Sequence, residues 1–498
     1  MLFTRVQLIV DVIVDGTQDI QRKEQESICI RYVDANLQPV EAFMGFYAVG
    51  ETTGSNIANC LEDALIRFQL SLENLRGQTY DGAANMKGSY KGCQALITQT
   101  QPLAIYVHCG AHCLNLIASD ACSASLKIRD SIHVVHELGV LCNASDKFKA
   151  FFGDISSSDE QVCSRNIRPL CPTRWLVRLP AIVSVLTQYA SILRALEEAH
   201  DACSPEVSST ASGLLSKFED GTTLANLLMA KDVIEPLETL NRSLQSTRMT
   251  VAGMLEAVDV LTRQLLAYRT VDHFDELFEE IETQVSQLDL EPVRLPRPRA
   301  TPKRFSGSGE AFHPKTAREH LRIEYFKMLD AAIVQLKERF SDSVGLTHYS
   351  ELETILLSGQ VSVVASSYPE LQPLSTLQIE LSMLRTNTPN LEGAKSSVDD
   401  YVNLLTKMLP EVRGMFPHVE SLVRLLLVNP ASSASAERSF SSLRRLKTYL
   451  RSTIGQARLN HVAISHIHKT TLDEIEVEEL MKQFVMHKDN RVAIFGKF

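Results

Sequence analysis

The chain has 498 residues, of which 44% are hydrophobic, and its formal net charge is −10. This length exceeds what one simple core holds, so it predicts two to four domains, or one domain with a large insertion. The negative charge excludes a protein coated with nucleic-acid-binding surface; such binding must come from local patches or a missing segment. Because no run of eighteen apolar residues occurs, we expect no membrane span and no membrane partner.

All ten cysteines lie between Cys29 and Cys203 without regular spacing, which favours reduced thiols over a disulfide framework. The apolar start, "MLFTRVQLIVDVIVDG", lacks a small-residue cleavage site. It is therefore interpreted as a strand rather than a signal peptide.

The first 110 residues alternate between strand and helix patterns. Strands are predicted over 7–16, 27–33, 42–49, a short segment leading into Tyr80, and 103–109; helices are predicted over 56–72 and 84–100. This order predicts a mixed sheet with helices packed on it.

From residue 111 the apolar spacing is almost entirely helical. The predicted helices are 111–142, 176–200, 224–246, 250–269, 273–288, 315–340, 374–386, 397–409 and 415–428, with breaks at 201–210 and 295–309. Two or three further helices fill 432–486 after Asn429 and Pro430. The residues alone leave open whether these last helices return to the sheet.

Asp15 and Asp81 each follow a predicted strand and precede a glycine. Side chains at the carboxyl ends of strands converge, and two carboxylates there suit a hard divalent cation. The alternative is that both are ordinary Asp-Gly turns. A nucleotide-phosphate loop is excluded, because Ser89 rather than lysine follows Gly88.

The segment "HCGAHCLNL" contains Cys109 and His112 at a zinc-like spacing. A structural zinc needs four ligands, and Cys163 and Cys171 are poorly spaced to complete them, so we expect no zinc in this chain. Trp175 is the only tryptophan; it is either a core anchor or an exposed ring that stacks on a base.

The segment 429–455 is the most distinctive of the chain. Its apolar stripe consists of Phe440, Leu443, Leu446 and Leu450. Between Ser433 and Arg458, one acid, Glu437, accompanies six basic residues: Arg438, Arg444, Arg445, Lys447, Arg451 and Arg458. The pattern fits either a helix with a solvated basic face or a phosphate-facing helix with one inward carboxylate.

Four segments together resemble the hAT superfamily of DNA transposases, in the animal branch related to zinc-finger MYM-type proteins. In order, they are "VIVDGTQDIQRKEQESICIRYVD", "GQTYDGAANMKGSYKG", "YVHCGAHCLNL" followed by "TRW", and "NPASSASAERSFSSLRRLKTYLRSTIGQARLNHVAISHIH". The last resembles the hAT C-terminal dimerisation region, and the four span nearly the whole chain.

The resemblance implies an α/β fold with a large all-α insertion: a ribonuclease-H-like mixed sheet, interrupted by a helical domain, with the helical C-terminus returning to the sheet. The implied domains are a first core part over 1–180, the insertion over 180–415, and the C-terminal core helices with the dimerisation region over 416–486. The implied catalytic and metal-binding acids are Asp15, Asp81 and Glu437, which would hold Mg²⁺ or Mn²⁺ for DNA strand cleavage and transfer.

The resemblance also implies a set of DNA-binding residues: Cys109, His112, Trp175, Arg438, Arg444 and Arg445. Members of the superfamily carry an N-terminal zinc finger before the first strand, whereas Met1 lies only fourteen residues before Asp15. We therefore expect the zinc finger to be missing and DNA binding to be weak.

The family further implies a nuclear protein that forms a homo-oligomer through its C-terminal region. The alternative to an active transposase core is a non-catalytic, domesticated or truncated dimerising nuclear protein. An unrelated α/β metal-dependent hydrolase explains Asp15 and Asp81 but not the C-terminal segment.

Overall fold

The structure is a computed structural model that describes residues 9–157, 178–296, 314–341, 344–387 and 397–496. The chain forms two compact units. Unit 1 comprises Met1–Cys109, Thr247–Val251 and Thr347–Phe498, and unit 2 comprises Gly110–Ser246 and Ala252–Leu346. Each unit is a set of residues that pack mainly on one another, and such a division does not test the domain boundaries at 180 and 416, which stay predictions.

Unit 1 contains a five-stranded mixed sheet in the order β3-β2-β1-β4-β5. Strands β1, β2 and β3 pair antiparallel, whereas β4 and β5 continue parallel to β1. The strands are β1 Val10–Gln18, β2 Glu24–Val33, β3 Pro39–Val49, β4 Leu75–Tyr80 and β5 Ile105–His108. The predicted α/β fold class, a mixed sheet in a chain that is otherwise helical, is confirmed.

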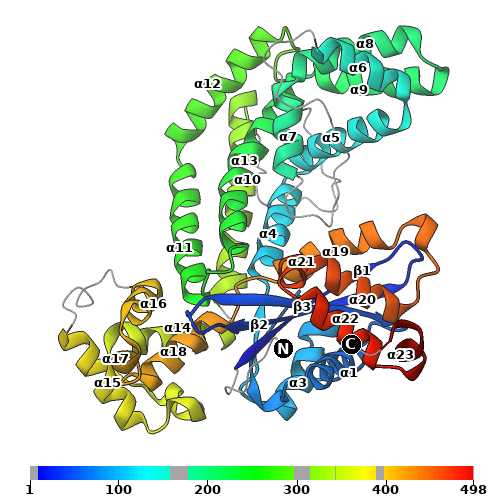
Figure 1. Cartoon of the computed structure of the whole chain (residues 1–498). Helices are drawn as coiled ribbons and strands as arrows, with labels where there is room; N and C mark the ends of the chain where they lie inside the picture. The colour runs from blue at the N-terminus through cyan, green and yellow to red at the C-terminus, as the bar shows by residue number, and fades with distance from the viewer. Residues whose placement is uncertain (1–8, 158–177, 297–313, 342–343, 388–396, 497–498) are drawn as a thin grey trace. The chain divides into compact units, whose positions relative to one another are not determined.

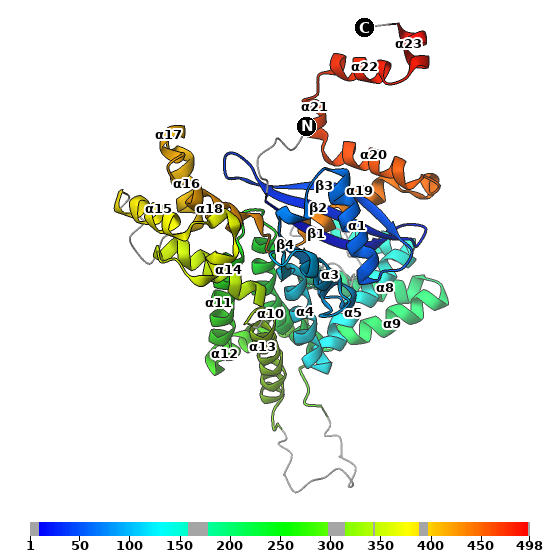
Figure 2. The ribbon, with the colours of Figure 1, turned by 90° about the horizontal axis from the view of Figure 1, so that it is seen from below.

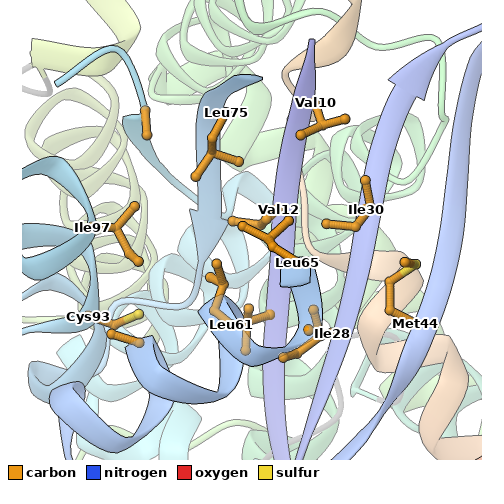
Figure 3. Packing of buried hydrophobic residues seen from close by; sticks show 14 of the residues in the cluster. Val10, Val12, Ile28, Ile30, Met44, Leu61, Leu65, Leu75, Cys93 and Ile97 are labelled. Atoms are coloured by element: carbon orange, nitrogen blue, oxygen red, sulfur yellow. The ribbon is translucent and has the colours of Figure 1, made fainter. Parts of the chain in front are cut away.

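One face of the sheet packs against helices α1 (Gly54–Arg67) and α3 (Cys93–Thr100) (Figure 2). Because strand side chains alternate between faces, Val10, Val12 and Val14 of β1 all point into this core. Figure 3 shows Val12 of β1 beside Leu65 of α1, with Val10 and Leu61 in the same cluster. Each large apolar side chain buried here contributes about 1.5–3 kcal/mol.

The opposite face packs against helices α19 (Ala434–Leu446) and α20 (Gln456–Ile467) (Figure 1). Ile13 of β1 lies in this second core with Phe440 and Leu443 of α19. The C-terminal helices therefore return to the sheet, as the resemblance implied. Leu450, predicted in the same apolar stripe, is instead 92% exposed, because α19 ends before it.

The remaining elements of unit 1 are mostly helical. They are η1 Leu72–Asn74, α2 Ala84–Lys87, α14 Val344–Ser358 from Thr347 onward, η3 Val363–Ser367, η4 Pro369–Leu371, α15 Leu374–Asn387, α16 Val398–Lys407, α17 Pro410–Arg413, α18 Pro417–Val428, η6 Tyr449–Arg451, α21 Lys469–Asp473, α22 Val477–Met486 and α23 Asp489–Phe495. Helix α14 was not predicted.

The single helix predicted over 84–100 is wrong, because it is interrupted between α2 and α3. A Cβ at Gly92 would lie 2.4 Å from the backbone nitrogen of Gly88. The two glycines thus allow the backbone to approach itself closely, which a continuous helix does not permit.

Unit 2 is built from helices: α4 Gly110–Ala124, α5 Leu126–Ala144, α6 Asp146–Ser157, α7 Arg178–Thr187, α8 Tyr189–Ala202, α9 Pro205–Glu219, α10 Gly221–Leu244, α11 Val251–Tyr268, α12 Val271–Gln287 and α13 Ala317–Ser341, with the first residue of α11 in unit 1.

Two predictions for unit 2 are corrected by helix caps. Ser125 interrupts the helix predicted over 111–142, because its side chain accepts a hydrogen bond from the backbone of Ile128 and begins α5. The break predicted over 201–210 is short, because Pro205 occupies the first position of α9, which suits proline.

No single helix among the described residues is long and apolar enough to cross a membrane. Helices α7 and α8 meet the length and composition criteria only as a pair, bent by 77°.

Candidate active site

Asp15 lies within β1, three residues before its last residue Gln18, and is half-buried. It points to the face of the sheet that α19 covers, because it follows Ile13 at strand spacing. Its Oδ1 accepts a hydrogen bond of 3.0 Å from the backbone N–H of Gly16. Its partner across the strand pair is Ser27 of β2.

Asp81 follows Tyr80, the last residue of β4. Strands β1 and β4 are parallel neighbours in which Ile13 pairs with Thr79, so Asp15 and Asp81 each lie two residues beyond a paired position. Asp81 also makes the turn that the Asp-Gly alternative predicted, since its Oδ1 accepts a 3.2 Å hydrogen bond from the backbone of Ala83.

Glu437 lies in the first turn of α19 and is half-buried. The helix is held over the sheet by a 2.8 Å hydrogen bond between the hydroxyls of Ser439 and Ser27. Because Ser27 is the cross-strand partner of Asp15, this contact brings the first turns of α19 over the end of β1.

The three predicted acids share one electrostatic environment. The pKa of Asp15 is raised well above its usual range, first by burial and then by the negative charges of Asp81 and Glu437. Burial and nearby like charge both disfavour the ionised carboxylate. The charges of Asp81 and Glu437 therefore act on Asp15, although Asp15 and Glu437 lie 422 residues apart in sequence.

The same acids do not form a finished metal site. Among the residues that the structure describes, no group of three or more His, Cys, Asp or Glu side chains is placed to hold a metal ion. Oxygen ligands of one Mg²⁺ lie about 2.0–2.1 Å from it, and thus no more than about 4 Å from each other. The donor chemistry suits a hard cation, but the geometry is too open, so Mg²⁺ and Mn²⁺ stay predictions.

Comparison with known proteins identifies two regions of the chain. Residues 7–92 match the family described as "ZMYM1/FAM200, RNase-like domain", and residues 397–470 match the "hAT family C-terminal dimerisation region". These matches cover the strands that carry Asp15 and Asp81 and the helix that carries Glu437. The chain is therefore similar to these two families over these two regions.

Relatives of the chain include the protein named "52 kDa repressor of the inhibitor of the protein kinase" in Homo sapiens and in Mus musculus. The human protein is 20% identical over 492 residues, which covers 92% of this chain and 61% of the relative. The mouse protein is 19% identical over 484 residues, covering 92% and 62%. The chain thus spans about three fifths of the length of these curated relatives.

Glu26 is a buried acid close enough to Asp81 to feel its charge, and the sequence analysis missed it; it points to the opposite face of the sheet from Asp15. It is 4% exposed and pairs across the strands with Gly16; a Cβ at Gly16 would lie 3.0 Å from both carboxylate oxygens of Glu26. Burial, followed by the charges of Asp81 and Glu24, raises the pKa of Glu26 to about 7. The sequence did contain an indication that Glu26 is buried: at strand spacing it falls on the same face of β2 as the buried Ile28 and Ile30.

The DNA-binding role of Cys109 stays a prediction, and the structure shows where the residue lies. Its side chain is fully buried, and its Sγ accepts a 3.2 Å hydrogen bond from the backbone of Ser433. Cys109 therefore holds Ser433, the residue before α19, from the interior of unit 1. His112 is half-buried in α4 of unit 2, and Trp175 lies outside the described residues.

The basic residues predicted on and just after α19 are exposed, with one exception. Arg438, Arg444 and Arg445 lie on the surface, and Arg438 donates a 2.6 Å hydrogen bond to Ser435. Lys447, expected on the same basic face, is instead buried and forms a 2.5 Å ion pair with Asp19. A buried lysine needs such a partner, because an unpaired buried charge is costly.

A row of charged residues inside the sheet supports the start of α19. Asp11, Arg31 and Glu41 are in register on β1, β2 and β3. Arg31 is 1% exposed, and its Nη1 lies 2.8 Å from the carboxylate of Glu41. The other oxygen of Glu41 accepts a hydrogen bond from Ser435 and lies 3.6 Å from Arg438. These contacts flank Glu437 on both sides.

Proposed function

We propose that this hAT-derived protein is a self-associating, DNA-binding nuclear protein. The observation that carries self-association is the match of residues 397–470 to the hAT dimerisation region. The relatives are named repressors. A self-associating DNA-binding protein is suited to a repressor role, because two copies engage DNA with higher avidity than one.

The helices after the matched region supply the surface for self-association. Helices α21–α23 with their connections expose many large apolar side chains: Leu472, Ile475, Val477, Leu480, Met481, Phe484, Met486, Ile494 and Phe495. Figure 2 shows α22 and α23 beyond α20, and they pack mainly on each other. Large exposed apolar patches mark interaction sites, and a second copy covering this patch continues the dimerisation region.

The exposed arginines of α19 and of the segment that follows it supply the local basic patch that DNA binding requires in an acidic chain. They are Arg438, Arg444, Arg445, Arg451 and Arg458. Contacts of this kind neutralise phosphates without reading the base sequence, so binding by this patch weakens as salt is added.

The test separates the two parts of the proposal. Light scattering should give the mass of a dimer or larger oligomer, and the double variant Met481→Glu/Phe484→Glu should shift the protein to monomer. The matched control is Ile66→Glu, since Ile66 is 74% exposed on α1. A wild-type protein that stays monomeric at tens of micromolar, or a control that dissociates equally, refutes self-association.

DNA binding is measured by fluorescence anisotropy with a labelled duplex over a range of salt concentrations. The variant Arg444→Glu/Arg445→Glu should weaken binding at least tenfold and reduce its salt dependence. The control, Arg194→Glu/Arg263→Glu, changes as many charges at exposed positions of unit 2. Equal affinity of the two variants contradicts a role for the patch.

A second candidate function, divalent-metal-dependent DNA strand cleavage, is favoured by one observation. The carboxylates of Asp81 and Glu437 both raise the pKa of Asp15. A bound cation would relieve this repulsion, so its binding should be strongest where all three acids are present. Isothermal titration with Mg²⁺ and Mn²⁺, and cleavage of nicked and hairpin DNA, test this function. Cleavage that persists unchanged in Asp81→Ala refutes it.

A further inference from the structure

Unit 2 contains a groove of about 640 Å³ that is lined by residues of helices α10 and α11. The residues that line it form one stripe on each helix. The α10 stripe is Asp232, Glu235, Pro236, Thr239, Leu240 and Ser243, and the α11 stripe is Gly253, Glu256, Ala257, Val260, Leu261, Gln264 and Tyr268. Both stripes follow i, i+3, i+4, i+7 spacing, so each helix presents one continuous face to the groove.

The groove has an apolar floor. Leu240 and Leu261 are buried beneath it, while Val260 is 55% exposed in the groove. Gly253 and Ala257 carry almost no side chain, which leaves room for a bulky apolar group to approach the α11 backbone. An apolar surface of this shape is suited to the apolar face of another helix.

The rim of the groove is acidic. Every charged residue that lines it is a carboxylate: Asp232, Glu235 and Glu256. Pro236 adds a further acceptor, because proline has no N–H to donate to the carbonyl of Asp232, four residues earlier in α10. A partner that supplies cationic donors therefore complements this rim, whereas an acidic partner or a phosphate is repelled.

One end of the groove is held rigid by an aromatic cluster. The carboxylate of Asp232 accepts a hydrogen bond from the hydroxyl of Tyr325 and lies 3.1 Å from Nε2 of His273. The ring of Tyr268 stacks on His273 with 4.2 Å between centroids and 4° between planes. Because these contacts fix Asp232 and Tyr268 before any partner arrives, binding costs less conformational entropy at this end.

We propose that this groove binds an amphipathic basic helix of a partner protein. The partner's apolar side chains would pack on Val260, Leu240 and Leu261, and its Lys and Arg side chains would pair with Glu235 and Glu256. The α10 stripe spans twelve residues from Asp232 to Ser243, about 16 Å at the helical rise, so it accommodates about three turns of a partner helix.

The probe is a fluorescent 16-residue helical peptide that carries leucine at i, i+3, i+4, i+7 spacing and lysine on the flanking positions. A second peptide has the same leucines but glutamate in place of every lysine. Anisotropy with the full chain should show saturable binding of the basic peptide and at least tenfold weaker binding of the acidic one.

Two variants test the groove itself, and both change exposed residues. Val260→Asp removes the apolar contact, and Glu235→Lys/Glu256→Lys reverses the rim; each should weaken binding of the basic peptide at least tenfold. The matched control is Glu197→Lys/Glu198→Lys, an equal charge change at exposed positions of α8. Circular dichroism confirms that each variant is folded.

Three results overturn the proposal. They are a wild-type chain that does not bind the basic peptide, a control pair that weakens binding as much as the rim pair does, and a Val260→Asp variant with unchanged affinity. The second result would assign binding to the net negative charge of the chain, and the third to charge without the groove.

Discussion

The buried ion pair between Lys447 and Asp19 makes a sharp prediction about how α19 is held. Lys447 directly follows the last residue of α19, and its Nζ lies 2.5 Å from Oδ2 of Asp19, just beyond β1. The side chains of Lys447 and Asp19 are 4% and 0% exposed, so water cannot replace either partner. We expect Lys447→Met to lower the free energy of unfolding and to loosen α19.

The size of the stability loss in Lys447→Met depends on the hydrogen bonds that Asp19 keeps. Breaking a buried ion pair by removing one partner costs about 3–5 kcal/mol. Asp19 keeps hydrogen bonds from the backbones of Gln21 and Lys23 and from the side chain of Gln25, so the lower end of that range, about 3 kcal/mol, applies. The exposed neighbour Arg445 provides the control: Arg445→Met should change stability by no more than about 0.5 kcal/mol.

The pH dependence has a definite sign. Burial by itself would raise the pKa of Asp19, but hydrogen bonds, first among them that of Lys447, lower it. Asp19 therefore contributes stability above its unfolded pKa of about 3.9, and this contribution is lost as pH falls through the lower folded pKa. In Lys447→Met the pKa of Asp19 is lowered less, so the protein should lose less stability between neutral and acidic pH than the wild type does.

The assay combines urea unfolding, followed by circular dichroism, with hydrogen exchange of the peptide that covers α19. A double-mutant cycle with Asp19→Asn should give a coupling of about 2 kcal/mol, because the two residues are in contact. Faster exchange should be confined to α19 and the elements packed on it. Additive single effects, or a Lys447→Met variant as stable as Arg445→Met, would refute the reasoning.

Two further predictions concern buried groups in the sheet. Glu26→Gln should raise the free energy of unfolding by about 2–3 kcal/mol at pH 8 and not at pH 4. The reason is that the folded state raises the pKa of Glu26 to about 7, so its carboxylate destabilises the fold as pH rises from the unfolded pKa through 7. Equal stabilisation at both pH values, measured by urea unfolding, contradicts this. Gly77→Ala should destabilise the protein by about 1–3 kcal/mol, because its Cβ would lie 2.2 Å from side-chain atoms of both Asp11 and Asn429. The control is Gly213→Ala, which has open space around the added Cβ. Equal effects of the two variants on the melting temperature would contradict the prediction.

Local patterns in the sequence were sufficient to predict the sheet and most helices. The alternation of β1 determined that Val10, Val12 and Val14 face one core, and the spacing of α19 determined that Phe440 and Leu443 face another. These features were predictable because period-2 and period-3.6 burial depends on neighbouring residues in the chain. Strand-end placement likewise indicated Asp15 and Asp81.

Caps and close backbone approaches decided the element boundaries that the patterns missed. The apolar spacing continues through Ser125, yet its hydroxyl begins a new helix. The spacing also continues through Gly88 and Gly92, where the backbone turns on itself. Such breaks depend on a single hydrogen bond or contact, which a periodic pattern does not register.

Tertiary structure alone decided which charged residues are buried. Lys447 and Glu26 read as surface residues in the sequence, but Lys447 meets Asp19, 428 residues away, and Glu26 lies over Gly16. The sequence by itself determined the identity of the acids and the faces of the strands on which they stand. The effect of Glu437 on the pKa of Asp15 could not be predicted in this way, because electrostatic coupling depends on distance in space and not along the chain. It depends on α19 packing on the sheet, where Ser439 contacts Ser27, 412 residues earlier.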